Sequence, residues 1–132
     1  MKAKMTRSLF VLTLALFACF TLNGCASLMF QTKSEQVHEY AIKNTGYDAA
    51  YTKALKAITD MGFSVFQSDK SSGTFTAHRG TGFTEVSEFN FMIEKNGSSH
   101  VITIRIKSNK PDEIKSEFLR AYGRYVRLQP IK

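Results

Sequence analysis

The sequence predicts an α+β domain in which two helices cover one face of a mostly antiparallel five-stranded sheet, in the order β-α-β-β-β-β-α. Two observations support this prediction. Apolar residues alternate with a period of two over five short segments, and they recur at helical spacing over two others. Each strand-like segment has one apolar side, so both helices should cover the same face of the sheet. No internal repeat interrupts residues 37–132, and we expect them to form a single domain.

The first strand is expected over residues 37–44, because alternate side chains there share one side of the segment. That side comprises His38, Tyr40 and Ile42. A helical segment separates this strand from the next, which is expected over residues 63–68. The two strands should therefore run parallel, joined by a right-handed crossover.

The first helix is expected over residues 45–62, where the hydrophobic period changes to helical spacing. Its apolar face comprises Tyr51, Ala54, Leu55, Ile58 and Met61. Thr45, followed three residues later by Asp48, resembles a capping box at the N-terminus. Gly62 is a good C-terminal stop.

Three further strands are expected over residues 74–79, 86–95 and 100–108. Val86 is out of phase with the alternation that follows it, which indicates a bulge or a later strand start. Asn96-Gly97 predicts a hairpin between the last two strands. The inward-facing side chains of these strands should be Phe75, Ala77, Phe89, Phe91, Ile93, Ile102, Ile104 and Ile106.

The last helix should open at Pro111, with Asp112 and Glu113 in its first turn. Its apolar stripe is expected to comprise Ile114, Phe118, Tyr122 and Tyr125. A second stripe, at offsets of four and seven, comprises Arg120, Arg124 and Arg127. Two interpretations of these arginines remain open. They are a solvated face with cations near a helix C-terminus, or a surface for an anionic partner.

The first 24 residues have the features of a secretory signal peptide. Lys2, Lys4 and Arg7 precede an apolar run over residues 8–22, and a small residue stands at the expected cleavage point. A spanning helix needs about 20 apolar residues, and this run is shorter. The alternative is an uncleaved N-terminal anchor.

The end of this leader, Leu22-Asn23-Gly24-Cys25, resembles the lipobox of bacterial lipoproteins. The resemblance implies that Cys25 receives a diacylglycerol on its sulfur, that the chain is cut before it, and that acyl chains such as palmitate anchor it. Residues 25–36 would then form a tether. Cys19 would leave with the leader. In many enteric lipoproteins, an aspartate directly after the cysteine resembles an inner-membrane retention signal. The residue at this position here is Ala26, which implies an outer-membrane location facing the periplasm.

The layout also resembles a family of small bacterial lipoproteins of unknown function, over most of residues 36–127. In that family, a helix of a characteristic pattern precedes a glycine and a strand. The matching residues are Tyr51, Ala54, Leu55, Ala57, Ile58 and Gly62. The resemblance brings no catalytic residues with it.

Charge narrows the choice of partners. The chain has 18 basic and 11 acidic residues, and loss of the three leader cations lowers its net charge from +7 to +4. A mildly basic chain fits contact with anionic lipid, cell wall or an envelope protein, and it also fits ordinary solubility. A nucleic acid partner is not expected for an exported protein, and no cofactor is predicted.

The residue types that carry catalysis form no recognisable set. His38, His78 and His100 come from three strands without the close ligand spacing of a zinc site, so no metal site is predicted. Serines cluster in turns, and no G-x-S-x-G motif occurs. We therefore expect a non-catalytic binding or scaffold module of the cell envelope. The alternative is a small hydrolase acting on a cell-wall or lipid-derived polymer, which would need a cleft that holds His78 and carboxylates.

Overall fold

The structure, a computed structural model, describes residues 33–80 and 85–131. The elements follow in the order β1 (Ser34–Lys43), α2 (Tyr47–Asp60), β2 (Ser64–Asp69), β3 (Thr74–Arg79), β4 (Ser87–Asn96), β5 (Ser99–Ser108), α3 (Pro111–Tyr122) and β6 (Arg127–Pro130). The predicted leader, Cys25 and residues 26–32 of the tether lie outside the described residues.

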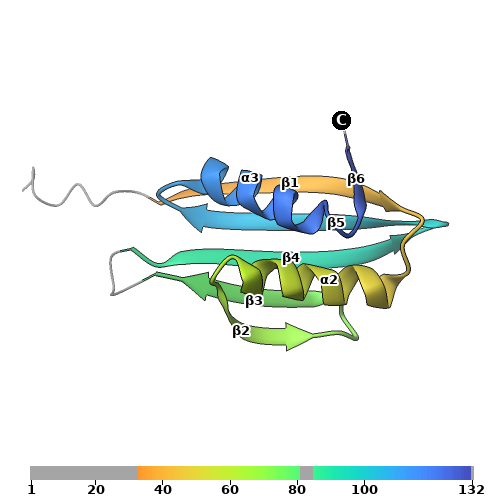
Figure 1. Cartoon of the computed structure of the whole chain (residues 1–132), viewed down its shortest axis with the longest axis horizontal. Helices are drawn as coiled ribbons and strands as arrows, with labels where there is room; N and C mark the ends of the chain where they lie inside the picture. The colour runs from red at the N-terminus through yellow and green to blue at the C-terminus, as the bar shows by residue number, and fades with distance from the viewer. Residues whose placement is uncertain (1–32, 81–84, 132) are drawn as a thin grey trace, which may run out of the picture. The chain divides into compact units, whose positions relative to one another are not determined.

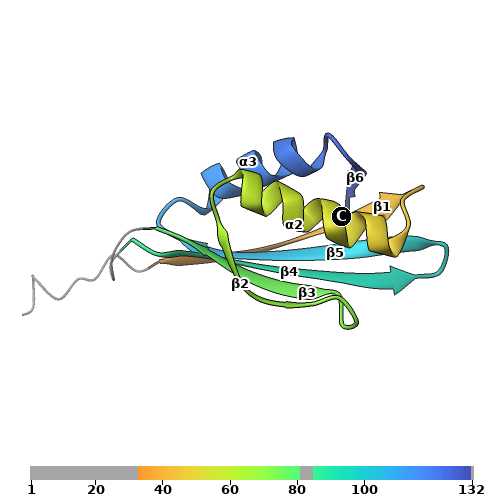
Figure 2. The ribbon, with the colours of Figure 1, turned by 60° about the horizontal axis from the view of Figure 1, so that its bottom comes forward.

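The described strands form one sheet of order β2-β3-β4-β5-β1-β6, and every neighbouring pair is antiparallel (Figure 1). Both helices cover one face of this sheet, and the other face is open (Figure 2). The predicted α+β class is therefore confirmed, with six strands in place of five. We call the covered side the helix layer and the opposite side the open face.

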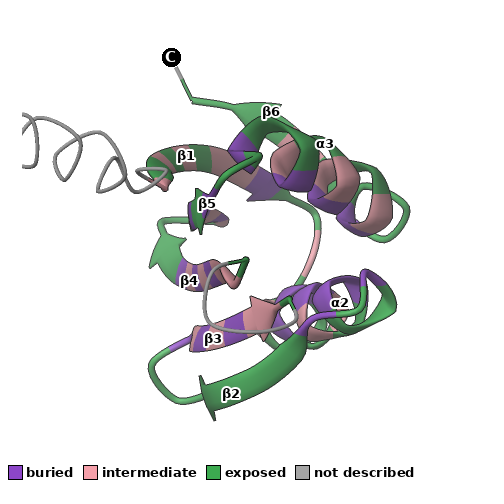
Figure 3. Cartoon of the chain, turned by 90° about the vertical axis from the view of Figure 1, so that its left-hand side faces the viewer, coloured by how far each residue is buried: buried purple, intermediate pink, exposed green. Residues whose placement is uncertain are grey.

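The core lies between the sheet and the helix layer, as the period-two alternation predicts. The inward-facing residues of β3, β4 and β5 are all buried, and the helices turn their buried sides toward them (Figure 3). Aromatic rings fill the centre: Phe91 stacks on Phe75 with ring centroids 4.8 Å apart, and Phe89 contacts Phe118 at 4.7 Å. Pairs of this kind stabilise a core beyond the area that they bury.

The first strand begins earlier than predicted. β1 starts at Ser34, which pairs with Ser108 of β5, so residues 34–36 belong to the sheet and not to the tether. The Lys33 ammonium donates a hydrogen bond to the Val86 carbonyl at 2.7 Å. β1 and β2 run in the same direction, as predicted, but β3, β4 and β5 lie between them.

The two ends of α2 differ in how well the sequence predicts them. The capping box predicted at Thr45 is wrong, because the N-cap is Gly46 and no side chain caps the helix. The predicted stop is confirmed. Gly62 adopts φ +80°, and the Phe63 N–H donates to the Ile58 carbonyl at 3.2 Å. This bond closes the C-terminal turn in the way of a Schellman motif.

The predicted hairpin between β4 and β5 is confirmed, although its turn lies one residue later. Asn96 pairs with Ser99, so Gly97 and Ser98 are the central residues. Gly97 has φ +60°. A glycine at the first central position is typical of a type II′ turn, whose twist matches that of the strands.

The C-terminal region departs most from the prediction. α3 opens at Pro111 as predicted but ends at Tyr122, where Gly123 follows as the C-cap. Tyr125, assigned to the apolar stripe, lies outside the helix and is 37% exposed. The chain then forms β6, an unpredicted four-residue strand that pairs with β1. The sequence pattern does not predict β6, because the strand is short and contains Pro130, and proline disfavours strands.

The expectation that each strand has one buried side is wrong for β2. All six of its residues are exposed, and Figure 3 shows the strand at one edge of the sheet. Val65 faces the same side as buried Ala77 but remains 38% exposed, and Phe66 is 75% exposed. The helix layer therefore does not extend over this edge.

Candidate functional site

The structure does not bring the three predicted arginines onto one helical stripe. Arg120 lies in the last turn of α3, Arg124 in the turn after it and Arg127 at the start of β6. Arg127 is opposite Lys43 of β1, while the next residue, Leu128, packs on the core. Successive strand residues point to opposite faces. Arg127 is therefore on the open face, and only Arg120 and Arg124 belong to the helix layer.

Tyr125, in the turn that follows α3, lies close to two lysines of α2. Its exposed ring lies under the Lys53 ammonium, 4.9 Å from the ring centroid. Lys56 is one turn along α2, and it pairs with Asp60 at 2.9 Å. The hydrogen bond to Asp60 raises the pKa of Lys56, and Tyr125 adds to the same effect. We name as the interhelix patch the residues Lys53 and Lys56 of α2, Arg120 of α3, and Arg124 and Tyr125 of the turn that follows α3.

Helical geometry places Lys56 and Arg120 on the solvent side of the layer. Arg120 follows buried Phe118 by two residues, and Lys56 follows buried Ala54 by two. Two residues correspond to about 200° around a helix, which is away from the core. Lys53, Arg120 and Arg124 form no ion pair with any residue that the structure describes.

A second group of polar side chains forms a row across the open face. The Thr76 hydroxyl donates to the Asn90 Oδ1 at 2.7 Å, and the Asn90 amide donates to the Glu88 Oε1 at 2.7 Å. The other Glu88 oxygen lies 3.8 Å from His78 Nε2, and His78 stacks on the exposed ring of Phe66 at 5.5 Å.

An open groove of about 400 Å³ lies beside this row. Its lining comprises Thr74, Phe75, Thr76, Glu88, Asn90, Phe91, Met92, Thr103 and Arg105. The polar groups of the row already bond to one another, so the open face presents a pre-ordered polar surface.

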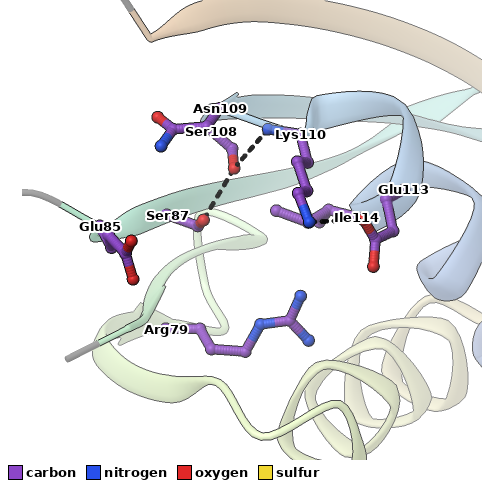
Figure 4. A pocket seen from close by; sticks show the side chains of 8 residues that line it. All are labelled: Arg79, Glu85, Ser87, Ser108, Asn109, Lys110, Glu113 and Ile114. Atoms are coloured by element: carbon purple, nitrogen blue, oxygen red, sulfur yellow. Dashed lines mark hydrogen bonds and ion pairs between the residues drawn. The ribbon is translucent and has the colours of Figure 1, made fainter. Parts of the chain in front are cut away.

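A second hollow, of about 290 Å³, lies where β5 ends and α3 begins (Figure 4). It is lined by Arg79, Glu85, Ser87, Ser108, Asn109, Lys110, Glu113 and Ile114. Arg79 enters from one side, while Ser108 and Lys110 lie on the other. The figure draws the contact between the Ser87 and Ser108 hydroxyls, at 2.8 Å, and the hydrogen bond from the Lys110 N–H to the Ser108 hydroxyl, at 3.2 Å.

The cations of this hollow also have partners. Lys110 lies 3.8 Å from Glu113. Arg79 donates to Glu117 at 3.0 Å and to the Met61 carbonyl at 2.8 Å. The Arg79 contacts join β3 to the middle of α3 and to the end of α2, which is a structural role.

The three histidines lie on three strands and do not meet. His38 contacts Gln36 at 3.0 Å, and burial lowers its pKa, with nearby Lys115 adding to the effect. His100 is buried with its Nε2 unpaired and lies 6.0 Å from the Tyr47 ring. Over residues 33–80 and 85–131, no three side chains of the metal-binding types are grouped to hold an ion.

The serines of the second hollow do not join the histidine–carboxylate pair. Ser87 bonds to Ser108, whereas its neighbour Glu88 points to the open face toward His78, because adjacent strand residues alternate. A serine nucleophile needs its base within hydrogen-bond reach, so these residues do not assemble a catalytic set.

Sequence reasoning missed Lys53, Lys56 and Tyr125 as parts of one surface. The available signal was a pair of lysines three residues apart on the polar side of α2. Nothing in the sequence places them beside a tyrosine 72 residues from Lys53, because that contact depends on how α2 and α3 pack.

Comparison with models of known protein families finds no match to this chain. Comparison with curated protein sequences finds none either. In the part of the chain that the structure describes, neither helix has the length and apolar character needed to cross a membrane.

Proposed function

We propose that this protein is a lipid-anchored envelope protein that binds a partner without catalysis. The observation that supports it best is the distance between anchor and domain. The lipobox-like segment ends at Cys25, and the compact unit begins at Lys33. The eight residues from Ala26 to Lys33 reach at most about 29 Å when fully extended. An acylated Cys25 would therefore hold the domain at the membrane surface.

The lipid carries the attachment in this proposal. A single acyl chain binds a membrane only reversibly, whereas two or more give stable anchoring. Ala26 favours the outer membrane, facing the periplasm. Fractionation of a two-membrane bacterium tests this location, and recovery of the protein with the inner membrane would contradict it.

Metabolic labelling with an alkynyl fatty acid tests the anchor itself. The wild-type protein should incorporate the label, and Cys25→Ala should abolish both labelling and removal of the leader. Cys19→Ala is the matched control, because it removes the other thiol without touching the lipobox, and it should label normally. Equal labelling of the Cys25→Ala variant would refute the anchor.

Binding is the activity that the exposed surfaces support. The open face offers a pre-ordered polar row, and the helix layer offers cations that have no ion-pair partner among the described residues. Cross-linking in intact cells, followed by identification of the captured molecules, tests this part of the proposal. A photoreactive residue at Thr52 samples the helix layer, and one at Glu39 samples the open face. No capture from either position would count against a binding module.

One observation favours the alternative, a small hydrolase of an envelope polymer. His78 and Glu88 lie 3.8 Å apart, and Glu88 also lines the open-face groove. Purified cell wall incubated with the protein distinguishes the two functions. A hydrolase would release soluble fragments, and Glu88→Gln would stop the release. A binding module would sediment with the polymer and leave it intact.

A further inference from the structure

We infer that the interhelix patch lies against the anionic surface of a lipid bilayer, so that the domain rests on its helix layer. The biological setting of this contact rests on the proposed lipid anchor. The contact itself depends only on the described surface.

The charges of the helix layer are not balanced. Each acidic side chain of the two helices is already engaged in an ion pair, as is shown by the pairs Asp48–Lys70, Asp60–Lys56, Asp112–Lys115, Glu113–Lys110 and Glu117–Arg79. Lys53, Arg120 and Arg124 remain without an ion-pair partner among the described residues. Lys53 and Arg120 lie on the two helices and Arg124 in the turn that follows α3. The helix layer therefore carries positive charge that no acidic side chain of the two helices balances, which favours an anionic surface.

The open face lacks this imbalance. Strand register places on it the cations Lys43, Arg105, Lys107 and Arg127, and among them the carboxylates Glu35, Glu39, Glu88 and Glu94. Arg105, for example, pairs with Glu35 at 3.3 Å. An anionic surface would therefore meet mixed charge on this face, and the helix layer is the side that fits it.

Tyr125 favours a bilayer over a purely ionic polymer. The residue is 37% exposed, and its ring lies close to the lysines of α2, with the Lys53 ammonium above it. Tyrosine is enriched where a protein meets the headgroup region, because its ring is apolar and its hydroxyl is polar. Lysine and arginine stems can lie along the same boundary while their charged ends reach the headgroups.

The tether allows this orientation. β1 and α3 both begin at the end of the sheet where the tether enters, since Ser34 pairs with Ser108 just before Pro111. A ten-residue strand such as β1 spans about 33 Å, and the tether reaches at most about 29 Å. Figure 2 shows both helices on one side of the sheet. A domain held by such a tether can lay this side on the membrane.

The test uses residues 26–132, without leader, Cys25 or lipid. Every buried apolar residue described lies between Ile42 and Val126, so this chain retains the core. Co-sedimentation should show binding to vesicles of phosphatidylglycerol and phosphatidylcholine at low salt, loss at high salt, and no binding to phosphatidylcholine alone. Each basic residue near an anionic surface contributes roughly fivefold, so K53Q/R120Q/R124Q should weaken binding by about 100-fold.

A matched control separates the patch from net charge. K43Q/K107Q/R127Q removes the same charge from open-face positions that also lack an ion pair among the described residues, and it should bind nearly as well as the unmodified chain. Equal loss in the two triple variants would overturn the inference. So would no binding at low salt, or binding to purified cell wall with none to vesicles.

Orientation provides the second measurement, because residues 26–132 contain no cysteine. A fluorophore at Thr52→Cys should be quenched by spin-labelled lipid, and one at Glu39→Cys on the open face should not. The reverse pattern, or equal quenching, would overturn the proposed orientation. Since no lipid is attached, failure of Cys25 acylation would leave this result standing, and a negative result here would leave the anchor standing.

Discussion

Tyr122 joins the two helices through one buried hydrogen bond, and its removal should have a measurable effect on stability. The side chain is fully buried, and its hydroxyl donates to the Ala50 carbonyl of α2 at 2.9 Å. Tyr122→Phe deletes only this hydroxyl. The Ala50 carbonyl still accepts a helical bond from four residues further on, so the loss should be about 1–1.5 kcal/mol.

The larger truncation sets the scale for this effect. The Tyr122 ring stacks on the Phe118 ring, with centroids 5.2 Å apart, and is T-shaped to the Phe91 ring, with centroids 6.2 Å apart. Tyr122→Ala removes these contacts and leaves a cavity, and it should cost about 3–5 kcal/mol. The ratio of the two losses would separate the contribution of the hydroxyl from that of the ring.

Urea denaturation of residues 26–132 measures both variants. With a slope of about 1–3 kcal/mol/M, the loss expected for Tyr122→Phe should lower the midpoint by roughly 0.3–1.5 M. Tyr125→Phe is the matched control. It removes the same group from a ring that is 37% exposed, and it should change stability by under about 0.5 kcal/mol. An unchanged midpoint for Tyr122→Phe, or an equal loss at Tyr125, would refute the assigned hydrogen bond.

The effect of pH gives a further check on the same bond. Burial raises the pKa of Tyr122 above its ordinary value. The phenol should therefore remain protonated, and able to donate, through the range in which an exposed tyrosine begins to ionise. The difference between wild type and Tyr122→Phe should stay constant from neutral pH to about pH 9. A difference that disappears below that pH would contradict the assignment.

Three further predictions test the fold. Ile104→Ala should cost about 2–5 kcal/mol and Thr103→Ala, on the open face, about 0.5 kcal/mol; similar losses in urea titrations would mean a wrong register. Gly73→Ala should cost at least about 2 kcal/mol, because its φ is +72° and a Cβ would meet the Ile93 carbonyl. Gly97 has φ +60° but open space around it, so Gly97→Ala should cost only about 1 kcal/mol. Equal losses in the two variants would exclude the clash at Gly73. Burial lowers the pKa of His38, so the unfolded chain binds that proton more readily, and stability should fall as pH drops below about 6.5. His38→Gln should flatten this part of the profile, and an unchanged slope would assign the dependence to another group.

Most of the fold could be predicted because local pattern and tertiary packing agree in the central strands. Phe89 and Phe91 alternate with polar residues, and both are buried against the helices. The same agreement holds for Ile102, Ile104 and the apolar side of α2. Where local preference and global packing point the same way, the pattern alone identifies the elements.

The errors arise where the deciding information is not local. The helical spacing of Arg120, Arg124 and Arg127 continues past Tyr122, but the chain turns at Gly123 so that Val126 and Leu128 can pack on the core. The spacing is then a coincidence of sequence. Arg127 is therefore separated from Arg120 and Arg124. No spacing within α3 could have identified the lysines of α2 that lie close to Tyr125.

The exposure of β2 has a similar origin, and it bears on which surface is free to bind. A strand at a sheet edge offers unpaired backbone groups that favour association. β6 protects one edge by its shortness, Arg127 and Pro130. β2 lacks such residues until Asp69, but its register with β3 shifts at Phe66, and a bulge of this kind twists an edge away from flat pairing. His78 also stacks on the Phe66 ring.

Both edges therefore have features that disfavour strand addition, and exposed Phe66 alone is no reason to place a partner there. Among the described residues, the helix layer is the surface on which basic side chains outnumber the acidic side chains that could pair with them.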